Sequence, residues 1–115
     1  MKKTLRAHPE ALLSSVCDAC SALEAHGERC KIMVMSSLCY ASLLKEDYKS
    51  EKHQIDALNA EDIEKFGCMS SIWGSFIYIQ SDMPPYEIEA YGGSCSELMI
   101  DHYDIWALAQ EIIAW

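Results

Sequence analysis

Two cysteines three positions apart are the first feature of this sequence that could do chemistry. Residues 17–20 have the sequence Cys-Asp-Ala-Cys, which is the spacing of half a zinc site or of a thiol–disulfide pair. A structural zinc site needs a second close pair of ligands, but His26 stands alone and Cys30 and Cys39 are nine positions apart. A redox pair usually begins a helix directly after a strand, whereas this pair falls within a helical pattern. We therefore expect two packing thiols, with metal or redox chemistry as the alternative.

Two glutamates on one predicted strand could act as paired carboxylates. Glu87 and Glu89 are two positions apart, which places both on the same face of a strand at about 7 Å from each other. Such a pair suits acid–base chemistry in principle, but no third acid or glycine-rich pocket sequence accompanies it. We expect a solvated strand face, which could equally bind arginines of a partner protein.

The histidines and the remaining cysteines suggest no catalytic arrangement. Cys95 and His102 are seven positions apart across a predicted strand, and His8, His26 and His53 are scattered. No phosphate-binding loop, dinucleotide fingerprint, zinc-protease motif or basic nucleic-acid-binding stripe occurs. The sequence therefore predicts no catalytic residue, no metal site and no cofactor, and a function other than catalysis.

Charge is distributed unevenly along the chain. All nine Lys and Arg residues lie between Lys2 and Lys65, and the residues after Lys65 include seven acids. The formal charge is −2 for residues 1–65 and −7 for residues 66–115, which together give the −9 of the whole chain. A surface of this sign repels nucleic acid and anionic membranes and attracts basic protein surfaces. Solubility alone is the alternative explanation.

Length and composition are those of one globular domain. The chain has 115 residues, of which 50% are apolar and 23% are charged, and this suffices for one modest core. No apolar run reaches the ~20 residues of a membrane span, and Pro9 and Glu10 interrupt the stretch that a secretory signal requires. We therefore expect a single domain over residues 1–115 in the cytoplasm, with six cysteines that are mostly reduced and partly buried.

The first half of the chain predicts three helices and one strand. A helix is expected near residues 9–25, followed by an apolar strand over 31–35. Ser36 is the candidate N-cap of the next helix. The inner face of that helix is expected to consist of Leu38, Ala41 and Leu44, with Tyr40 beside them. Residues 47–58 suggest a loop or a solvated helix extension, and 59–67 a short helix that Asn caps and Gly ends.

The second half predicts a meander and a final helix. Strands are expected over 71–80, 86–91 and 97–100, with turns at 81–85 and at 92–93. Residues 101–115 suggest a helix with apolar residues on two sides, which is typical of a buried helix or of one that contacts a partner. The expected fold is α+β, with a small antiparallel sheet of three to four strands packed by an N-terminal and a C-terminal helix.

Two segments resemble a pattern in the major capsid proteins of tailed phages. Residues 32–44 have the sequence IMVMSSLCYASLL, and residues 72–84 have the sequence IWGSFIYIQSDMP. In that family an apolar strand leads into a helix with an aromatic residue, and a later apolar strand with a glycine ends in a polar-Asp-x-Pro turn. Small phage proteins of unknown function are similar. The resemblance covers about a quarter of the chain. It implies shared local architecture and a phage or prophage origin, without the long arm and extended loop of shell subunits.

These patterns together favour a small acidic phage- or prophage-type protein that binds a basic protein surface. By covering such a surface it could inhibit a host nucleic-acid-binding protein, without direct contact to nucleic acid or membrane. The expected partner-binding residues are Asp82, Glu87, Glu89, Glu97, Asp101 and Asp104, with Trp106, Ile113 and Trp115 as an apolar anchor. The alternative is an accessory or capsid-like structural protein that self-associates through its C-terminal helix.

Overall fold

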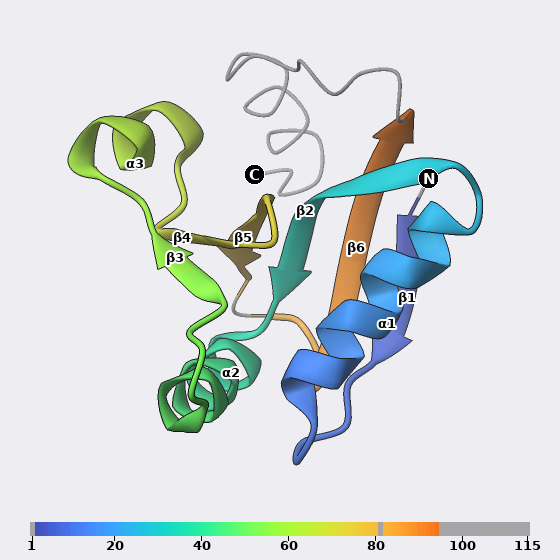
Figure 1. Ribbon diagram of the computed structural model, residues 1–115, viewed down its shortest axis with the longest axis horizontal. Coiled ribbons are helices and arrows are strands. Elements are labelled where there is room, and N and C mark those ends of the chain that lie inside the picture. The colour runs from blue at the N-terminus through green and yellow to red at the C-terminus, as the bar shows by residue number, and fades with distance from the viewer. Residues whose placement is uncertain (1, 81, 95–115) are drawn as a thin grey trace.

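A computed structural model describes residues 2–80 and 82–94 of the chain. Strands and helices alternate through the first two thirds of this part, and three consecutive strands complete it (Figure 1). The elements, in chain order, are β1 (Lys2–Arg6), α1 (Leu12–Glu24), β2 (Glu28–Met35), α2 (Ser37–Lys49), β3 (Ile55–Ala57), α3 (Ala60–Phe66), β4 (Ser70–Ile72), β5 (Ser75–Ile79) and β6 (Glu87–Ser94).

The strands form one mixed sheet of six strands in the order β1-β6-β2-β5-β4-β3. β2 and β5 are parallel, and every other neighbouring pair is antiparallel. The fold is therefore α+β, but the predicted antiparallel sheet of three to four strands with two packing helices is wrong. The prediction missed both edge strands, because β1 is dominated by charged residues and β3 has only three residues. The strand predicted over 97–100 and the helix predicted over 101–115 lie outside the described residues.

Helix α1 covers one face of the sheet, where it lies against β1, β2 and β6 (Figure 1). The prediction of this helix is confirmed, although it begins at Leu12 rather than at Pro9. Its apolar side chains recur every three or four residues and are almost completely buried. They are Leu12, Val16, Ala19 and Leu23. Together with Met33, Met35, Ile88 and Ala90 of the sheet, they form the centre of the larger hydrophobic core.

Helix α2 has the predicted cap but a different inner face. The Ser36 hydroxyl accepts the backbone N–H of Cys39 at 3.1 Å, which confirms the N-cap. The side chains that α2 buries are Cys39, Leu43 and Asp47. Leu38 and Leu44, which were predicted to face inward, are 51% and 40% exposed. Both sets of residues have helical spacing. Cys39 and Leu43 of the buried set belong to the larger core, together with the buried side chains of α1.

The strand predicted over 71–80 is a hairpin instead. β4 and β5 are joined by Trp73 and Gly74, whose φ angles are 50° and 80°. Two consecutive positive φ angles are typical of the tight turn whose twist matches paired strands. The predicted turn at Gly92 and Gly93 is also wrong, because both glycines continue β6 and pair with Cys30 and Arg29 of β2.

The second face of the sheet carries a smaller core. Ile32 and Val34 of β2 are fully buried there beside Tyr78 of β5. Phe66 of α3 stacks at a tilt on Phe76, with ring centroids 4.4 Å apart. The predicted short helix over 59–67 is confirmed: the Asn59 side chain accepts the Asp62 N–H at 2.8 Å, and Gly67 ends the helix with φ 73°. Apolar side chains are thus buried on both faces of the sheet.

Candidate functional site

The two glutamates predicted to bind a partner lie on one face of β6, as their spacing indicated. Glu89 is engaged by neighbouring side chains, whereas Glu87 has no ion-pair partner among the described residues. Glu89 lies 3.9 Å from the Lys2 ammonium and accepts the Tyr91 hydroxyl at 2.8 Å. Burial of Tyr91, followed by its bond to this carboxylate, raises the pKa of the phenol to about 12. Lys2 thus offsets part of the negative charge of β6. Glu89 is therefore mainly a structural partner of its neighbours.

Glu87 differs from Glu89 in that no ion pair engages its carboxylate within the described residues. Its neighbour across the antiparallel pair is Arg6 of β1, yet these two side chains form no salt bridge. A surface hollow of about 540 Å³ opens at this position, lined by Arg6, Pro84, Pro85, Tyr86 and Glu87. Asp82, which is exposed, lies in the connection between β5 and β6. The structure thus brings Asp82 and Glu87 to the β5–β6 connection, with one cation beside them.

The other six predicted partner-binding residues lie outside the described residues: Glu97, Asp101, Asp104, Trp106, Ile113 and Trp115. Cys95 and His102 lie outside them as well. The acidic surface described here is therefore the part contributed by the β5–β6 connection and β6.

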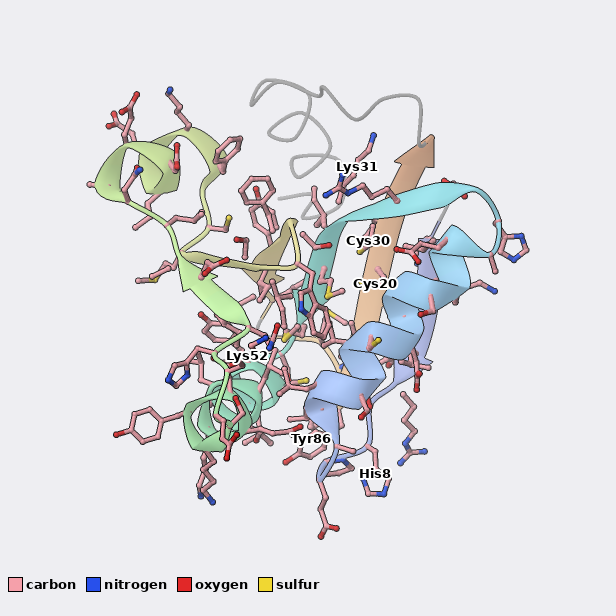
Figure 2. All side chains as sticks on the ribbon, viewed as in Figure 1. His8, Cys20, Cys30, Lys31, Lys52 and Tyr86 are labelled. Atoms are coloured by element: carbon pink, nitrogen blue, oxygen red, sulfur yellow. The ribbon has the colours of Figure 1, made fainter. Side chains whose placement is uncertain are left out.

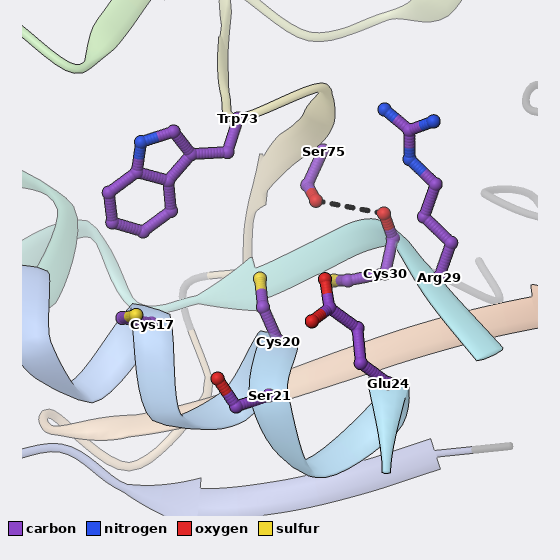
Figure 3. Close-up of a pocket in the computed structure, with 8 residues that line it drawn as sticks. All are labelled: Cys17, Cys20, Ser21, Glu24, Arg29, Cys30, Trp73 and Ser75. Carbon is purple, nitrogen blue, oxygen red and sulfur yellow. Dashed lines mark hydrogen bonds between the residues drawn. The ribbon is translucent and has the colours of Figure 1, made fainter. Parts of the chain in front are cut away.

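A second hollow, of about 470 Å³, lies between α1, β2 and the β4–β5 hairpin. Cys17 and Cys20 reach it from successive turns of α1, and Cys30 reaches it from β2 (Figure 3). Its remaining lining residues are Ser21, Glu24, Arg29, Trp73 and Ser75. Its volume is within the usual range of small-molecule sites, and its lining combines an aromatic ring, both signs of charge and three thiols.

Cys20 on α1 and Cys30 on β2 both line this hollow (Figure 2), and each has the largest effect on the pKa of the other. Cys20 is half-buried and Cys30 is 4% exposed. The Cys30 side chain, and then burial, raise the pKa of Cys20. The Cys20 side chain lowers the pKa of Cys30, burial opposes this shift, and the Cys30 thiol donates a hydrogen bond to the Ile32 carbonyl at 3.7 Å. The pair therefore contains one thiol that holds its proton and one that releases it more readily.

The hairpin turn fixes the far wall of this thiol pocket, by which we mean the 470 Å³ hollow. The Trp73 indole donates a hydrogen bond to the Gln54 side chain at 2.8 Å. The Ser75 hydroxyl donates to the Cys30 carbonyl at 2.9 Å, which joins the hairpin to β2 (Figure 3). Gly74 permits the close approach of Arg29, since a methyl group at this glycine would lie 3.0 Å from Nη2.

Sequence reasoning singled out Cys17 and Cys20 but did not find their neighbour. The two lie within a helix, as predicted, and Cys30 comes to them from the strand that follows it. A detectable signal was the position of Cys30 at the start of β2, since a helix and the strand after it commonly pack together. Arg29 and Trp73 were not predicted as site residues, because their approach depends on the hairpin.

Two searches of the described residues gave negative results. No group of three or more His, Cys, Asp or Glu side chains in this part of the chain is arranged to hold a metal ion. None of the helices within 2–80 and 82–94 has the length and apolar character needed to cross a bilayer. Comparisons with protein-family models, with curated proteins and with solved structures gave no match for this chain.

Proposed function

We propose that this protein acts by binding a partner protein with a basic surface, and that the β5–β6 connection is part of the docking surface. The observation that carries the proposal is the Glu87 carboxylate, which has no ion-pair partner among the described residues, at the hollow formed with Pro84, Pro85 and Tyr86. Exposed Asp82 lies in the same connection. The net charge of −9, with no Lys or Arg after Lys65, supports attraction of a basic surface.

The connection is held in place by three hydrogen bonds. The Ser36 hydroxyl at the start of α2 donates to the Pro85 carbonyl at 2.6 Å. The Ala7 N–H donates to the Tyr86 carbonyl at 2.6 Å, and the Glu87 N–H to the Pro84 carbonyl at 3.3 Å. A segment ordered in this way loses little conformational entropy on binding. Two prolines and a tyrosine then supply apolar contact, and the acidic side chains orient the basic partner as it approaches.

The charges of the docking surface favour a partner of a particular chemistry. Asp82 and Glu87 suit lysines and arginines, which can form charge-assisted hydrogen bonds with carboxylates. Arg6, beside Glu87, can bind one acidic group of the partner, and this restricts the orientation in which the partner docks. A partner of this kind is a nucleic-acid-binding protein in the same cytoplasm, which the acidic surface would inhibit. The sequence resemblance to phage proteins supports a phage or prophage origin for such an inhibitor.

Capture from a host lysate tests this proposal. Immobilised wild-type protein and the variant Asp82→Lys/Glu87→Lys are incubated with lysate, washed at low and at high salt, and the retained proteins are quantified by mass spectrometry. We expect basic proteins that wild type retains at low salt only and that the variant loses, because added salt screens exposed charges. Glu64→Lys, a reversal at an exposed acid on α3, is the matched control and should retain them.

Two outcomes of this experiment count against the proposal. Retention of the same basic proteins by the Asp82→Lys/Glu87→Lys variant would remove the docking surface from the β5–β6 connection. Retention of no basic protein by wild type, together with a stable dimer in light scattering, would favour the alternative of self-association through residues 101–115.

A further inference from the structure

The proposed docking function does not use the thiol pocket, although that pocket gathers more reactive groups than any other hollow described above. Three of its eight lining residues are cysteines, and they come from two different elements. Cys17 is exposed, Cys20 is half-buried and Cys30 is buried, so they form a series from solvent to the interior. The other described cysteines, Cys39 and Cys68, do not line it.

Within this series, the contact between Cys20 and Cys30 is the one that suits disulfide chemistry. The two side chains belong to α1 and β2, and both line the pocket (Figure 3). Cys17 and Cys20, in contrast, project from successive turns of one helix, and a helical backbone restrains their approach to each other. The Ser75 bond to the Cys30 carbonyl fixes the strand that carries the buried sulfur.

The pocket opens to solvent beside half-buried Cys20, so a small oxidant reaches the pair from this side although Cys30 itself is 4% exposed. We propose that Cys20 and Cys30 are a redox-active dithiol that a hydroperoxide entering the thiol pocket converts into an intramolecular disulfide. Cys30 is the attacking sulfur and Cys20 the resolving one. This site is independent of the docking surface, which lies at the other end of β6.

The reaction takes place in two steps. The Cys30 thiolate attacks one peroxide oxygen, the O–O bond breaks, and the leaving alkoxide or hydroxide takes up the proton that Cys30 released, giving a sulfenic acid at Cys30. The Cys20 sulfur then attacks the Cys30 sulfur, the S–O bond breaks, and hydroxide leaves with the Cys20 proton as water. Overall two thiols are oxidised and one hydroperoxide is reduced to an alcohol, or to water when it is hydrogen peroxide, with one further water released.

The thiolate is assigned to Cys30 from the groups around both sulfurs. The Cys20 side chain favours a negative charge on Cys30 although burial opposes it, whereas Cys30, burial, Cys17 and the Glu24 carboxylate all oppose a negative charge on Cys20. Arg29 is the one cationic side chain among the described residues that line the pocket. The attacking sulfur must be a thiolate, whereas the resolving sulfur can keep its proton until the second step, and the difference between the two pKa values fits these roles.

Peroxide titration of the folded protein followed by peptide mapping tests the proposal. The protein carries Cys95→Ser, so that a cysteine outside the described residues does not contribute. We expect hydrogen peroxide to give a Cys20–Cys30 cross-link that a dithiol reductant removes. The cross-link should be lost in Cys20→Ser, where dimedone should label Cys30 instead, and should persist in the matched control Cys17→Ser.

A second probe separates the proximity of the two thiols from their redox chemistry. Phenylarsine oxide condenses with two adjacent thiols and releases water without any oxidation, so it reports the pair even where a variant oxidises differently. We expect one equivalent to protect Cys20 and Cys30 from alkylation in wild type, and this protection to be lost in Cys30→Ser. Circular dichroism verifies that each variant is folded.

Three results would overturn the proposal. Arsenical protection without a peroxide-induced disulfide would show that the thiols are adjacent but not redox-active. A Cys17–Cys20 cross-link or a Cys17-linked dimer as the main product would assign the reactivity to the exposed thiol. Absence of both protection and cross-link in the folded protein would show that the pair does not act together.

Discussion

Glu46 of α2 caps the N-terminus of α1 by accepting the backbone N–H of Leu12 at 2.8 Å. Its second carboxylate oxygen accepts the N–H of Leu13 at 3.1 Å. The residue at the N-cap position of α1, Ala11, has no side chain that could do this, and the first turn of α1 contains no acid. A carboxylate from a different helix therefore satisfies two of the free N–H groups and meets the positive end of the helix dipole.

Removal of this cap should destabilise the fold. Glu46→Ala is expected to lower the free energy of unfolding by about 1 to 2 kcal/mol, since two N–H groups at the start of α1 lose their acceptor. Urea denaturation followed by circular dichroism measures the change. Glu64→Ala, at an exposed acid of α3, is the control and should change stability by no more than about 0.5 kcal/mol. An equal loss in both variants would show that the cap does not contribute.

A neighbouring carboxylate organises the segment after α2. Asp47 is 5% exposed and accepts the backbone N–H of Gln54 at 2.6 Å and, more weakly, that of Ile55 at 3.4 Å. Asp47→Ala leaves these groups without an acceptor, and we expect a loss of about 1 to 3 kcal/mol. Hydrogen exchange should accelerate at Gln54 and Ile55 in particular. Asp56→Ala, at an exposed position of β3, should leave exchange at these two amides nearly unchanged.

Glu46 and Asp47 also show where sequence reasoning failed. Helical periodicity located α2, but several apolar residues lie on its exposed side, and the pattern favoured Leu38, Ala41 and Leu44 as the inner face. The face that is buried contains Asp47, and its burial is compensated by backbone groups seven and eight residues later in the chain. A pattern based on hydrophobicity cannot identify a buried acid whose partners are backbone N–H groups.

The local signals that were read correctly depend on neighbouring residues only. Ser36 and Asn59 cap helices through N–H groups three residues later, and Gly67 ends α3 with a positive φ angle. Trp73 was read as a strand residue because its ring and its apolar neighbours favour a strand. Its φ angle of 50° is set by the pairing of β4 with β5, which short-range patterns do not contain.

The thiol pocket was missed for the same reason. The sequence placed Cys17 and Cys20 in a helix, and that was right. Cys30 becomes their neighbour only when α1 packs on β2, and Trp73 only when the hairpin forms. The proximity of these groups is therefore a property of tertiary packing rather than of motif spacing.

The hairpin turn offers a test of how closely Arg29 approaches Gly74. Gly74→Ala places a side chain at φ 80°, 3.0 Å from Arg29 Nη2, whereas Gly27→Ala places one at φ 75° in open space. Each change should cost about 1 kcal/mol from the backbone conformation, and Gly74→Ala should cost more. If the excess comes from Arg29, the double variant Gly74→Ala/Arg29→Ala should recover it in thermal denaturation. An excess that the double variant does not recover would come from a source other than Arg29, and no excess at all would show that Arg29 moves aside at little cost.

Buried Cys39 makes stability depend on pH in the alkaline range. Burial raises the pKa of the Cys39 thiol from 9.0 to about 11, so the folded state holds the proton more tightly than the unfolded state. The resulting stabilisation is complete below pH 9.0 and is lost as pH rises toward about 11. It amounts to at most about 3 kcal/mol, because each pKa unit corresponds to ~1.4 kcal/mol. Urea denaturation across this range should show the decline.

A variant without this thiol isolates its share of the alkaline decline. Cys39→Ala lowers stability at every pH, because it leaves a small cavity in the core, but its stability should fall less steeply between pH 9.0 and about 11 than that of wild type. Cys17→Ala removes an exposed thiol and should leave the wild-type slope unchanged. If Cys39→Ala and wild type lost stability in parallel across this range, the decline would have to come from other groups. Buried Cys68 and Tyr78, whose pKa values burial also raises, would then be the next to replace.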